Sequence, residues 1–225
     1  MPTFLLIRHG ETDYNKKMHI AGRMPDVHIN PTGRQQAQSL ADKLASIPIK
    51  AIYSSPMERA METALPLAKS LKLEIIPIPG LLETNCGEWQ GQSVKKLRRL
   101  KVWRSLQQYP SLFHFPGGES IVECQYRMVQ VLETLRQKHA ERDLVACFSH
   151  ADPLKQLIAH YIGLPLDHFQ RLSISPGSIS ALQITESGGR LLMLNYSANL
   201  AWNAFQPPVQ TKSPHPQPPG NRTDR

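Results

Sequence analysis

Short apolar runs alternate along the chain with stretches in which apolar residues recur at helical spacing. The first run, at residues 4–7, is apolar on both faces, which is typical of a strand buried inside a sheet. Further strands are expected at residues 51–53, 73–78 and 143–148. Helices are expected at residues 32–47, 93–108, 119–139 and 152–161. A further helix is expected to begin at Ser54-Ser55-Pro56, with a serine as its N-cap. Strands that alternate with helices in this way predict an α/β layered domain.

The last part of the chain departs from this alternation. Residues 178–185 and 190–196 are expected to pair as a hairpin, because Ser187-Gly188-Gly189 is a turn signal between them. From residue 206 onward, prolines occur throughout and apolar periodicity ends, which predicts a disordered tail over residues 206–225. We therefore expect one domain over residues 1–205, a length that is sufficient for a single core.

The chain carries a formal net charge of +8 at pH 7. Such a charge favours an anionic partner, and nucleic acid, an acidic membrane surface or a small phosphorylated substrate all fit it. Part of the positive charge is concentrated in ten residues, at Lys95, Lys96, Arg98, Arg99, Lys101 and Arg104.

Cysteine usage and hydropathy indicate the compartment. The three cysteines, Cys86, Cys124 and Cys147, are far apart and odd in number, so they predict neither a disulfide framework nor a zinc site. The first residues do not have the pattern of a secretory signal, and we find no apolar run of membrane-spanning length. We therefore expect a cytoplasmic protein that does not bind a membrane.

Two of the expected strands end in histidine, in "FLLIRHG" and "LVACFSH". Because ligands of open α/β sheets bind beyond the carboxyl ends of the strands, His9 and His150 are expected to meet at one edge. Arg8 precedes His9, and Arg59 lies one turn into the helix that follows residues 51–53. Guanidinium groups match phosphate oxygens in pairs, so these four side chains predict a cationic site of phosphate size.

Four motifs extend this site into a recognisable pattern. "LIRHGET", "SSPMERAMET", "ETNCGEWQG" and "CFSHADPLK" occur in this order between Leu5 and Lys155. Together they resemble the histidine phosphatase superfamily, in its phosphoglycerate-mutase-like branch. The resemblance implies a three-layer α/β/α sandwich with a mostly parallel central sheet.

The resemblance also implies a role for each matching residue. His9 corresponds to the nucleophile that forms a phosphohistidine, and Arg8, Arg59 and His150 correspond to residues that hold the phosphoryl oxygens. Glu83 corresponds to the acid that protonates the leaving group. Three further positions are implied to contact the substrate, namely Asn15, Gly22 and Ala151.

General chemistry supports these implied roles. A neutral imidazole is a competent nucleophile, and neighbouring cations lower its pKa further below about 6.5. Fixed guanidinium groups stabilise the charge on the equatorial oxygens during phosphoryl transfer. An alkoxide leaves poorly without a proton, so a carboxylic acid is needed, and its carboxylate can then activate water. No metal or other cofactor is expected, since the protein supplies the positive charge.

Other carboxylates compete with Glu83 for the role of the acid. Glu11 follows the nucleophile closely, but its side chain can simply hold the loop. Glu88 is as consistent with a surface position as with a ligand contact. Asp152 is expected to cap the helix that follows His150. We therefore favour Glu83 on the strength of its place in the third motif.

The segments between the third and fourth motifs have lesser expected roles. The basic side chains of residues 93–108 are typical of a solvated helix face. In the family, however, the corresponding segment covers the phosphate pocket, so Lys95, Arg98 or Arg99 could contact a second anionic group. "FHFPGGES" is expected to form a turn into the long helix, with Ser120 at the pocket rim. Cys86 is interpreted as a small buried hydrophobic residue.

The sequence thus predicts a phosphomonoester hydrolase that acts on a small phosphorylated metabolite and binds no nucleic acid. One alternative is a phosphoglycerate mutase, since both activities share the core residues. The other is a non-catalytic module that binds a phosphoprotein or nucleic acid through its basic segment. The physiological substrate and the oligomeric state stay open.

Overall fold

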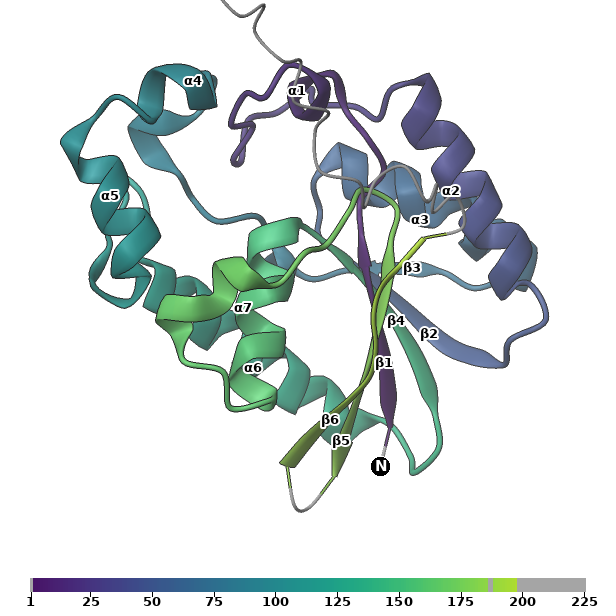
Figure 1. The fold of residues 1–225 in the computed structure, drawn as a ribbon. Coiled ribbons are helices and arrows are strands. Elements are labelled where there is room, and N and C mark those ends of the chain that lie inside the picture. The colour runs from purple at the N-terminus through teal and green to yellow at the C-terminus, as the bar shows by residue number, and fades with distance from the viewer. Residues whose placement is uncertain (1, 186–187, 198–225) are drawn as a thin grey trace, which may run out of the picture.

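The central sheet has a mixed but mostly parallel arrangement (Figure 1). The computed structural model describes residues 2–185 and 188–197, and within them the strand order is β3-β2-β4-β1-β5-β6. The strands are β1 (Thr3–Arg8), β2 (Ile49–Ser54), β3 (Ile75–Pro77), β4 (Leu144–Ser149), β5 (Ile179–Thr185) and β6 (Gly188–Tyr196). Strands β1 to β4 are parallel, and the β5–β6 hairpin adds an antiparallel edge. This confirms the expected sheet and the expected hairpin.

Helices cover both faces of the sheet, so the fold has three layers (Figure 1). One face packs against α2 (Pro31–Leu44) and α3 (Glu58–Leu71). The other face packs against α6 (Ile121–Lys138) and α7 (Ala151–Tyr161). The three-layer α/β/α sandwich is therefore confirmed.

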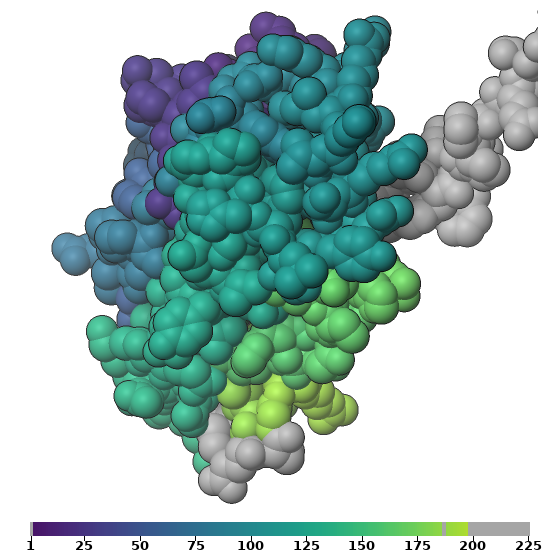
Figure 2. Space-filling view, turned by 90° about the vertical axis from the view of Figure 1, so that its left-hand side faces the viewer, coloured from purple at the N-terminus to yellow at the C-terminus, as the bar shows by residue number. Residues whose placement is uncertain are grey.

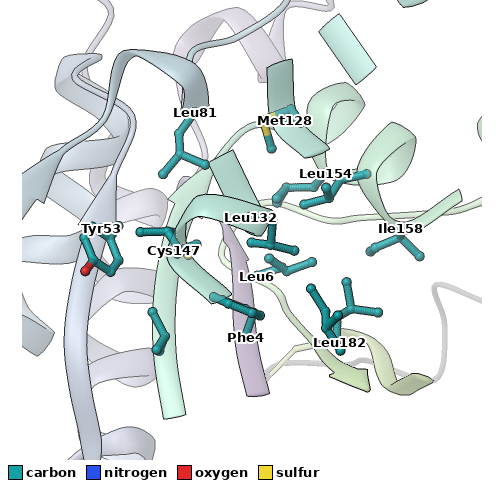
Figure 3. Packing of buried hydrophobic residues seen from close by; sticks show 14 of the residues in the cluster. Phe4, Leu6, Tyr53, Leu81, Met128, Leu132, Cys147, Leu154, Ile158 and Leu182 are labelled. Atoms are coloured by element: carbon teal, nitrogen blue, oxygen red, sulfur yellow. The ribbon is translucent and has the colours of Figure 1, made fainter. Parts of the chain in front are cut away.

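Strand β1 shows why a doubly apolar run becomes a central strand. Successive side chains of a strand point to opposite faces. Leu5 and Ile7 pack toward α2 and α3, whereas Phe4 and Leu6 pack toward α6 and α7. Figure 3 shows the second set, in which Phe4 and Leu6 meet Leu132. Burial on both faces fixes the strand, and with it the position of the residues that follow its end.

The remaining elements are short and lie mainly beyond the carboxyl ends of the parallel strands (Figure 1). They are α1 (Asp13–Lys16), α4 (Val94–Leu97), α5 (Lys101–Gln108) and the 3-10 helices η1 (Pro79–Leu81), η2 (Gly87–Trp89), η3 (Pro110–Leu112) and η4 (Leu166–Arg171). Figure 2 looks onto the side that carries α4 and α5. Under these two helices lies a separate aromatic cluster that includes Trp89 and Phe115.

The expected single helix over residues 93–108 is wrong, since α4 and α5 are separate helices. Apolar residues recur there every three positions, and on an α-helix of 3.6 residues per turn such a stripe rotates by about 60° at each step. The break between the helices lets Leu97 and Leu106 enter the same cluster, while Leu100 at the break is 42% exposed. Trp103 stacks on Trp89 at 5.9 Å between ring centroids.

The start of the helix after β2 differs from the expected one. The helix after β2 begins only at Glu58, and its N-cap residue is Met57, which makes no side-chain cap. The hydroxyl of Ser54 instead donates to the carbonyl of Ser55, and that of Ser55 contacts His150. The expected serine N-cap is therefore wrong, because both hydroxyls are used elsewhere.

The expected domain boundary near residue 205 and the tail over residues 206–225 lie outside the described residues. In the part of the chain that the structure describes, no helix has the length and apolar character needed to cross a bilayer.

Candidate active site

The turn after β1 presents His9 in a defined tautomer. The backbone N–H of His9 donates to the carbonyl of Ser149 at 3.0 Å, which ties the residue to the end of β4. Its Nδ1 lies 2.7 Å from the carbonyl oxygen of Gly10. Because a carbonyl only accepts, Nδ1 carries the proton and Nε2 keeps a free lone pair. Burial, together with Arg59 and Arg8, lowers the pKa of His9 well below 6.5, so the ring is neutral.

His150 occupies the matching position after β4. It is fully buried at the N-cap of α7, and its ring centroid lies 5.2 Å from that of His9. Its Nε2 is 2.9 Å from the hydroxyl of Ser55, and its Nδ1 is 3.8 Å from Oε2 of Glu83. Burial and the positive charge of Arg59 lower the pKa of His150 well below 6.5. The expected meeting of the two histidines is confirmed.

Two guanidinium groups, that of the buried Arg59 and that of the half-buried Arg8, complete the cationic side of the site. Nη2 of Arg59 donates to the carbonyl of Gly22 at 2.7 Å, and Nη1 of Arg8 donates to that of Ile174 at 2.6 Å. Burial lowers the pKa of both groups, yet a guanidinium stays charged in proteins.

Arg8, Arg59 and His150 each have a side-chain nitrogen that makes no hydrogen bond with any described residue. The atoms are Nε of Arg8, Nη1 of Arg59 and Nδ1 of His150, and all three are buried. Buried polar nitrogens without partners are costly, so their convergence needs an explanation. Three segments far apart in the sequence thus supply unpaired nitrogens around a neutral imidazole, an arrangement that suits an anion.

Glu83 places a carboxyl group beside this site. It lies in the segment after η1, and its Oε1 accepts from the backbone N–H of Thr84 at 2.9 Å. Burial and the nearby carboxylate of Asp152 raise the pKa of Glu83 to about 7, although Arg59 acts in the opposite direction. A carboxyl group with this pKa can donate and accept a proton near neutral pH.

A cavity of about 540 Å³ borders most of these groups, although the fully buried His150 is not among its lining residues. Arg8, His9, Arg59 and Glu83 line one part of it, and α4 and α5 contribute a further set of lining residues. That set consists of Val94, Arg98, Trp103, Leu106 and Gln107. The segment over residues 94–108 therefore borders the cavity as expected. Of the three basic candidates, Arg98 lines the cavity, whereas Lys95 and Arg99 are exposed and are not among its lining residues.

The three expected substrate contacts all line the same cavity. Oδ1 of Asn15 accepts from the backbone N–H and the hydroxyl of Thr12, both at 3.0 Å, so the amide NH₂ is at the opposite end of the group. Gly22 has φ +53°, a conformation that favours glycine, and its carbonyl orients Arg59. Ala151 is the first residue of α7 and contributes the N-terminus of that helix.

The competing carboxylates have other surroundings. Oε1 of Glu11 accepts from Nδ2 of Asn30 at 2.8 Å, so it holds the loop. Glu88 is exposed and is not among the lining residues of the cavity. The expectation that Asp152 caps α7 is wrong, because the helix begins at Ala151 and Asp152 lies in its first turn. Asp152 lines the cavity, where its Oδ1 accepts from Nζ of Lys155 at 3.2 Å.

Sequence reasoning missed several contributors. Ser55 contacts His150, and Thr63 accepts from the backbone N–H of Gly10 at 2.9 Å, which supports the turn that carries His9. Both residues lie in the second motif, but a hydroxyl has no pattern that reveals its partner. Lys155 closes the fourth motif and lines the cavity.

Cys86 also lines the cavity and is 7% exposed, as its interpretation as a small buried residue predicts. Burial raises the pKa of its thiol well above 9, so the sulfur stays protonated. Among the described residues, no cluster of three or more histidine, cysteine or acidic side chains could hold a metal ion.

Comparison with known proteins identifies the family pattern. A sequence model of the histidine phosphatase superfamily (branch 1) matches residues 4–197. Phosphoserine phosphatase 1 of Hydrogenobacter thermophilus is 29% identical over 202 residues, which cover 89% of this chain and 95% of that protein. The probable phosphoglycerate mutase GpmB of Proteus mirabilis is 32% identical over 185 residues, which cover 81% and 85%.

A solved structure shows the same arrangement. Phosphoserine phosphatase from Entamoeba histolytica, in complex with 3-phosphoglyceric acid, has a TM-score of 0.81 and 25% sequence identity. The match covers 89% of this chain and 100% of that chain. The fold is therefore shared over most of the chain.

Proposed function

Since the chain belongs to branch 1 of the histidine phosphatase superfamily and is a phosphoric monoester hydrolase for small phosphorylated metabolites, we propose that it works through a phosphohistidine at His9. The observation that carries this proposal is the convergence of three unpartnered buried nitrogens around a neutral imidazole. A binding module without catalysis, the alternative from another class, has no need of a free nucleophile beside a proton donor.

In the first step, Nε2 of His9 attacks the phosphorus atom. Arg8, Arg59 and His150 hold the equatorial oxygens, whose negative charge these groups stabilise. The bond from phosphorus to the ester oxygen breaks, and the departing oxygen takes the carboxyl proton of Glu83. The alcohol leaves, and His9 carries the phosphoryl group.

In the second step, water attacks the phosphohistidine. The Glu83 carboxylate left by the first step accepts a proton from this water. The bond from nitrogen to phosphorus breaks, and inorganic phosphate and neutral His9 are regenerated. A pKa of about 7 suits a group that acts first as acid and then as base.

The substrate occupies the cavity with its ester group beside His9. Asn15, Gly22 and Ala151 contact the phosphate or its surroundings, and the alcohol part faces α4 and α5. Arg98 and Lys155 line the same cavity, which supports a substrate with a second anionic group. The solved relative that binds 3-phosphoglyceric acid carries such a ligand.

The first experiment is hydrolysis of p-nitrophenyl phosphate by His9→Ala, which we expect to be abolished. His160→Ala is the matched control, because His160 is an exposed histidine outside the lining of the cavity. Circular dichroism checks that both variants are folded. An active His9→Ala enzyme contradicts the proposal.

A second experiment separates hydrolysis from the mutase alternative. We favour hydrolysis because the stretch between Glu83 and His150 is compact, whereas mutases of the family carry a longer one. Incubation with 3-phosphoglycerate and its bisphosphate primer is expected to release inorganic phosphate. Rapid formation of 2-phosphoglycerate supports the mutase.

We place this enzyme in the cytoplasm and expect it to work without nucleic acid. The three cysteines are free and buried, which suits a reducing compartment. Cell fractionation tests the location. Salt-sensitive binding to RNA without phosphatase activity contradicts the expected partner.

A further inference from the structure

Two arginines from different parts of the fold hold the backbone of the proposed acid. The carbonyl oxygen of Glu83 accepts from Nε of Arg23 at 2.8 Å and from Nη2 of Arg127 at 3.0 Å. Arg127 lies on α6, and Arg23 directly follows Gly22, whose carbonyl orients Arg59. The acid is therefore connected both to the long helix and to the phosphate side of the site.

One carboxylate joins these two arginines. Oε1 of Glu119 accepts from Nη2 of Arg23 at 3.0 Å and from Nη2 of Arg127 at 2.8 Å. It also accepts from the backbone N–H of Asn85 at 2.8 Å, while Oε2 accepts from Nε of Arg127 at 3.1 Å. The side chain of Glu119 is 15% exposed. Burial acts to raise its pKa, but the hydrogen bonds from Arg127 bring the pKa below its usual value, so the group is ionised.

The two glycines before Glu119 allow this close approach. A Cβ on Gly118 would lie 2.1 Å from the carbonyl oxygen of Asn85, and the N–H of Glu119 donates to that same oxygen at 2.9 Å. Gly117 has φ +65°. The "PGGE" turn is thus shaped to dock on the segment that carries Glu83.

That segment has no regular secondary structure of its own. Residues 82–86 lie between two 3-10 helices and outside any strand. A segment without a ladder of backbone hydrogen bonds takes its position from side-chain contacts, and proton transfer to a leaving group tolerates little displacement. The Glu119 contacts are therefore placed where they control the geometry of catalysis.

We propose that Glu119 is a positioning residue for Glu83, acting through a clamp that consists of Arg23, Arg127 and Glu119. The inference rests on the proposed function, in which Glu83 protonates the leaving group. The clamp holds the Glu83 carboxyl group within reach of the ester oxygen. Its loss affects the proton-dependent step and leaves the phosphate contacts of His9 in place.

The test is Glu119→Gln, assayed with an alkyl phosphate and with p-nitrophenyl phosphate. The amide keeps the shape but cannot accept the same four hydrogen bonds. We expect kcat for the alkyl ester to fall at least about tenfold, with KM changed less than twofold. The aryl ester leaves without a proton, so its kcat is expected to change less than threefold.

Two further variants make the result decisive. Glu123→Gln is the matched control, because Glu123 caps the start of the same helix α6 without touching the clamp, and it is expected to leave the ratio of the two rates unchanged. Arg23→Lys keeps the charge but removes the forked donor, and it is expected to repeat the selective loss if Glu119→Gln does not fold.

Equal losses on both esters, or no loss on the alkyl ester, overturn the positioning role. Glu83→Gln measured alongside distinguishes this outcome from failure of the proposed function. Suppose that Glu83→Gln selectively loses activity toward the alkyl ester but Glu119→Gln does not. The acid role of Glu83 is then supported, and the positioning role of Glu119 is wrong. If both variants lose activity equally toward the two esters, the assignment of Glu83 as the acid is wrong.

Discussion

The two sides of the catalytic cavity differ in how they are built. The side proposed to hold the phosphate includes His9 and Arg59, neither more than 3% exposed, at the end of a buried strand and on a long helix, with the fully buried His150 next to His9. The side proposed to face the alcohol consists of α4 and α5, of four and eight residues, joined by a break. Arg98, its basic lining residue, is exposed.

This difference suggests that one side of the cavity stabilises the transition state and the other side binds the rest of the substrate. Groups that stabilise a transition state must be held rigidly in a low-dielectric site, which the buried side provides. Groups that bind the substrate equally well in the ground state and in the transition state change KM rather than kcat, and they can lie on short elements near solvent. We therefore expect substitutions on the buried side to change kcat and those on the other side to change KM.

Among the variants that keep His9, removal of Arg59 is expected to have the largest effect. Arg59→Ala deletes a donor at the phosphoryl oxygens, and such a loss typically lowers kcat by about 10²–10³-fold. The measurement is steady-state hydrolysis of p-nitrophenyl phosphate. Arg99→Ala is the control, since this arginine is exposed and does not line the cavity, and a comparable loss in Arg99→Ala would contradict the comparison.

Replacement of Glu83 is expected to come next. Glu83→Gln cannot protonate the leaving oxygen, so kcat for alkyl esters should fall by about 10²-fold. Aryl esters, which leave as stable anions, should lose much less. Rates for both ester types from the same enzyme preparations provide the test, and equal losses argue that Glu83 is not the acid.

The pH profile gives a more moderate effect. Glu83 must be protonated to act as the acid, and its pKa of about 7 places the loss of activity toward alkyl esters above pH 7. His9, with a pKa well below 6.5, stays neutral throughout this range. Asp152→Asn removes a negative charge that raises the pKa of Glu83, so the alkaline limb should move to lower pH. An unchanged limb in Asp152→Asn contradicts this assignment.

Substitution of Arg98 is expected to have the smallest effect. Arg98→Ala should raise KM a few-fold for a substrate with a second anionic group and leave kcat unchanged. An exposed ion pair contributes only about 0.2–1 kcal/mol, which corresponds to this range. A fall in kcat without a change in KM in Arg98→Ala would contradict the proposal that the two sides of the cavity have different roles.

The same difference explains which features the sequence could reveal. Strand ends are predictable because a doubly apolar run must be buried, and "FLLIRHG" and "LVACFSH" mark where two such runs stop. The meeting of His9 and His150 followed from that pattern and from parallel topology. The order of the four motifs supplied Glu83, which no periodicity indicates.

Features that depend on tertiary contacts were not predictable. The break between α4 and α5 follows from the aromatic cluster beneath them, which brings Trp103 against Trp89. Asp152 was expected to cap a helix because its residue type favours that position, but His150 occupies it. The clamp around Glu119 joins residues up to 96 positions apart, and nothing local to "PGGES" reveals its two arginines.

The most direct test of the central claim is chemical identification of the phosphorylated residue. The enzyme is mixed rapidly with a phosphate ester, quenched in alkali, where phosphohistidine survives, and digested for mass spectrometry. The account predicts phosphate on the imidazole of His9, formed before inorganic phosphate appears and absent from His9→Ala. Phosphate on another side chain, or turnover without any phosphorylated enzyme, would contradict it.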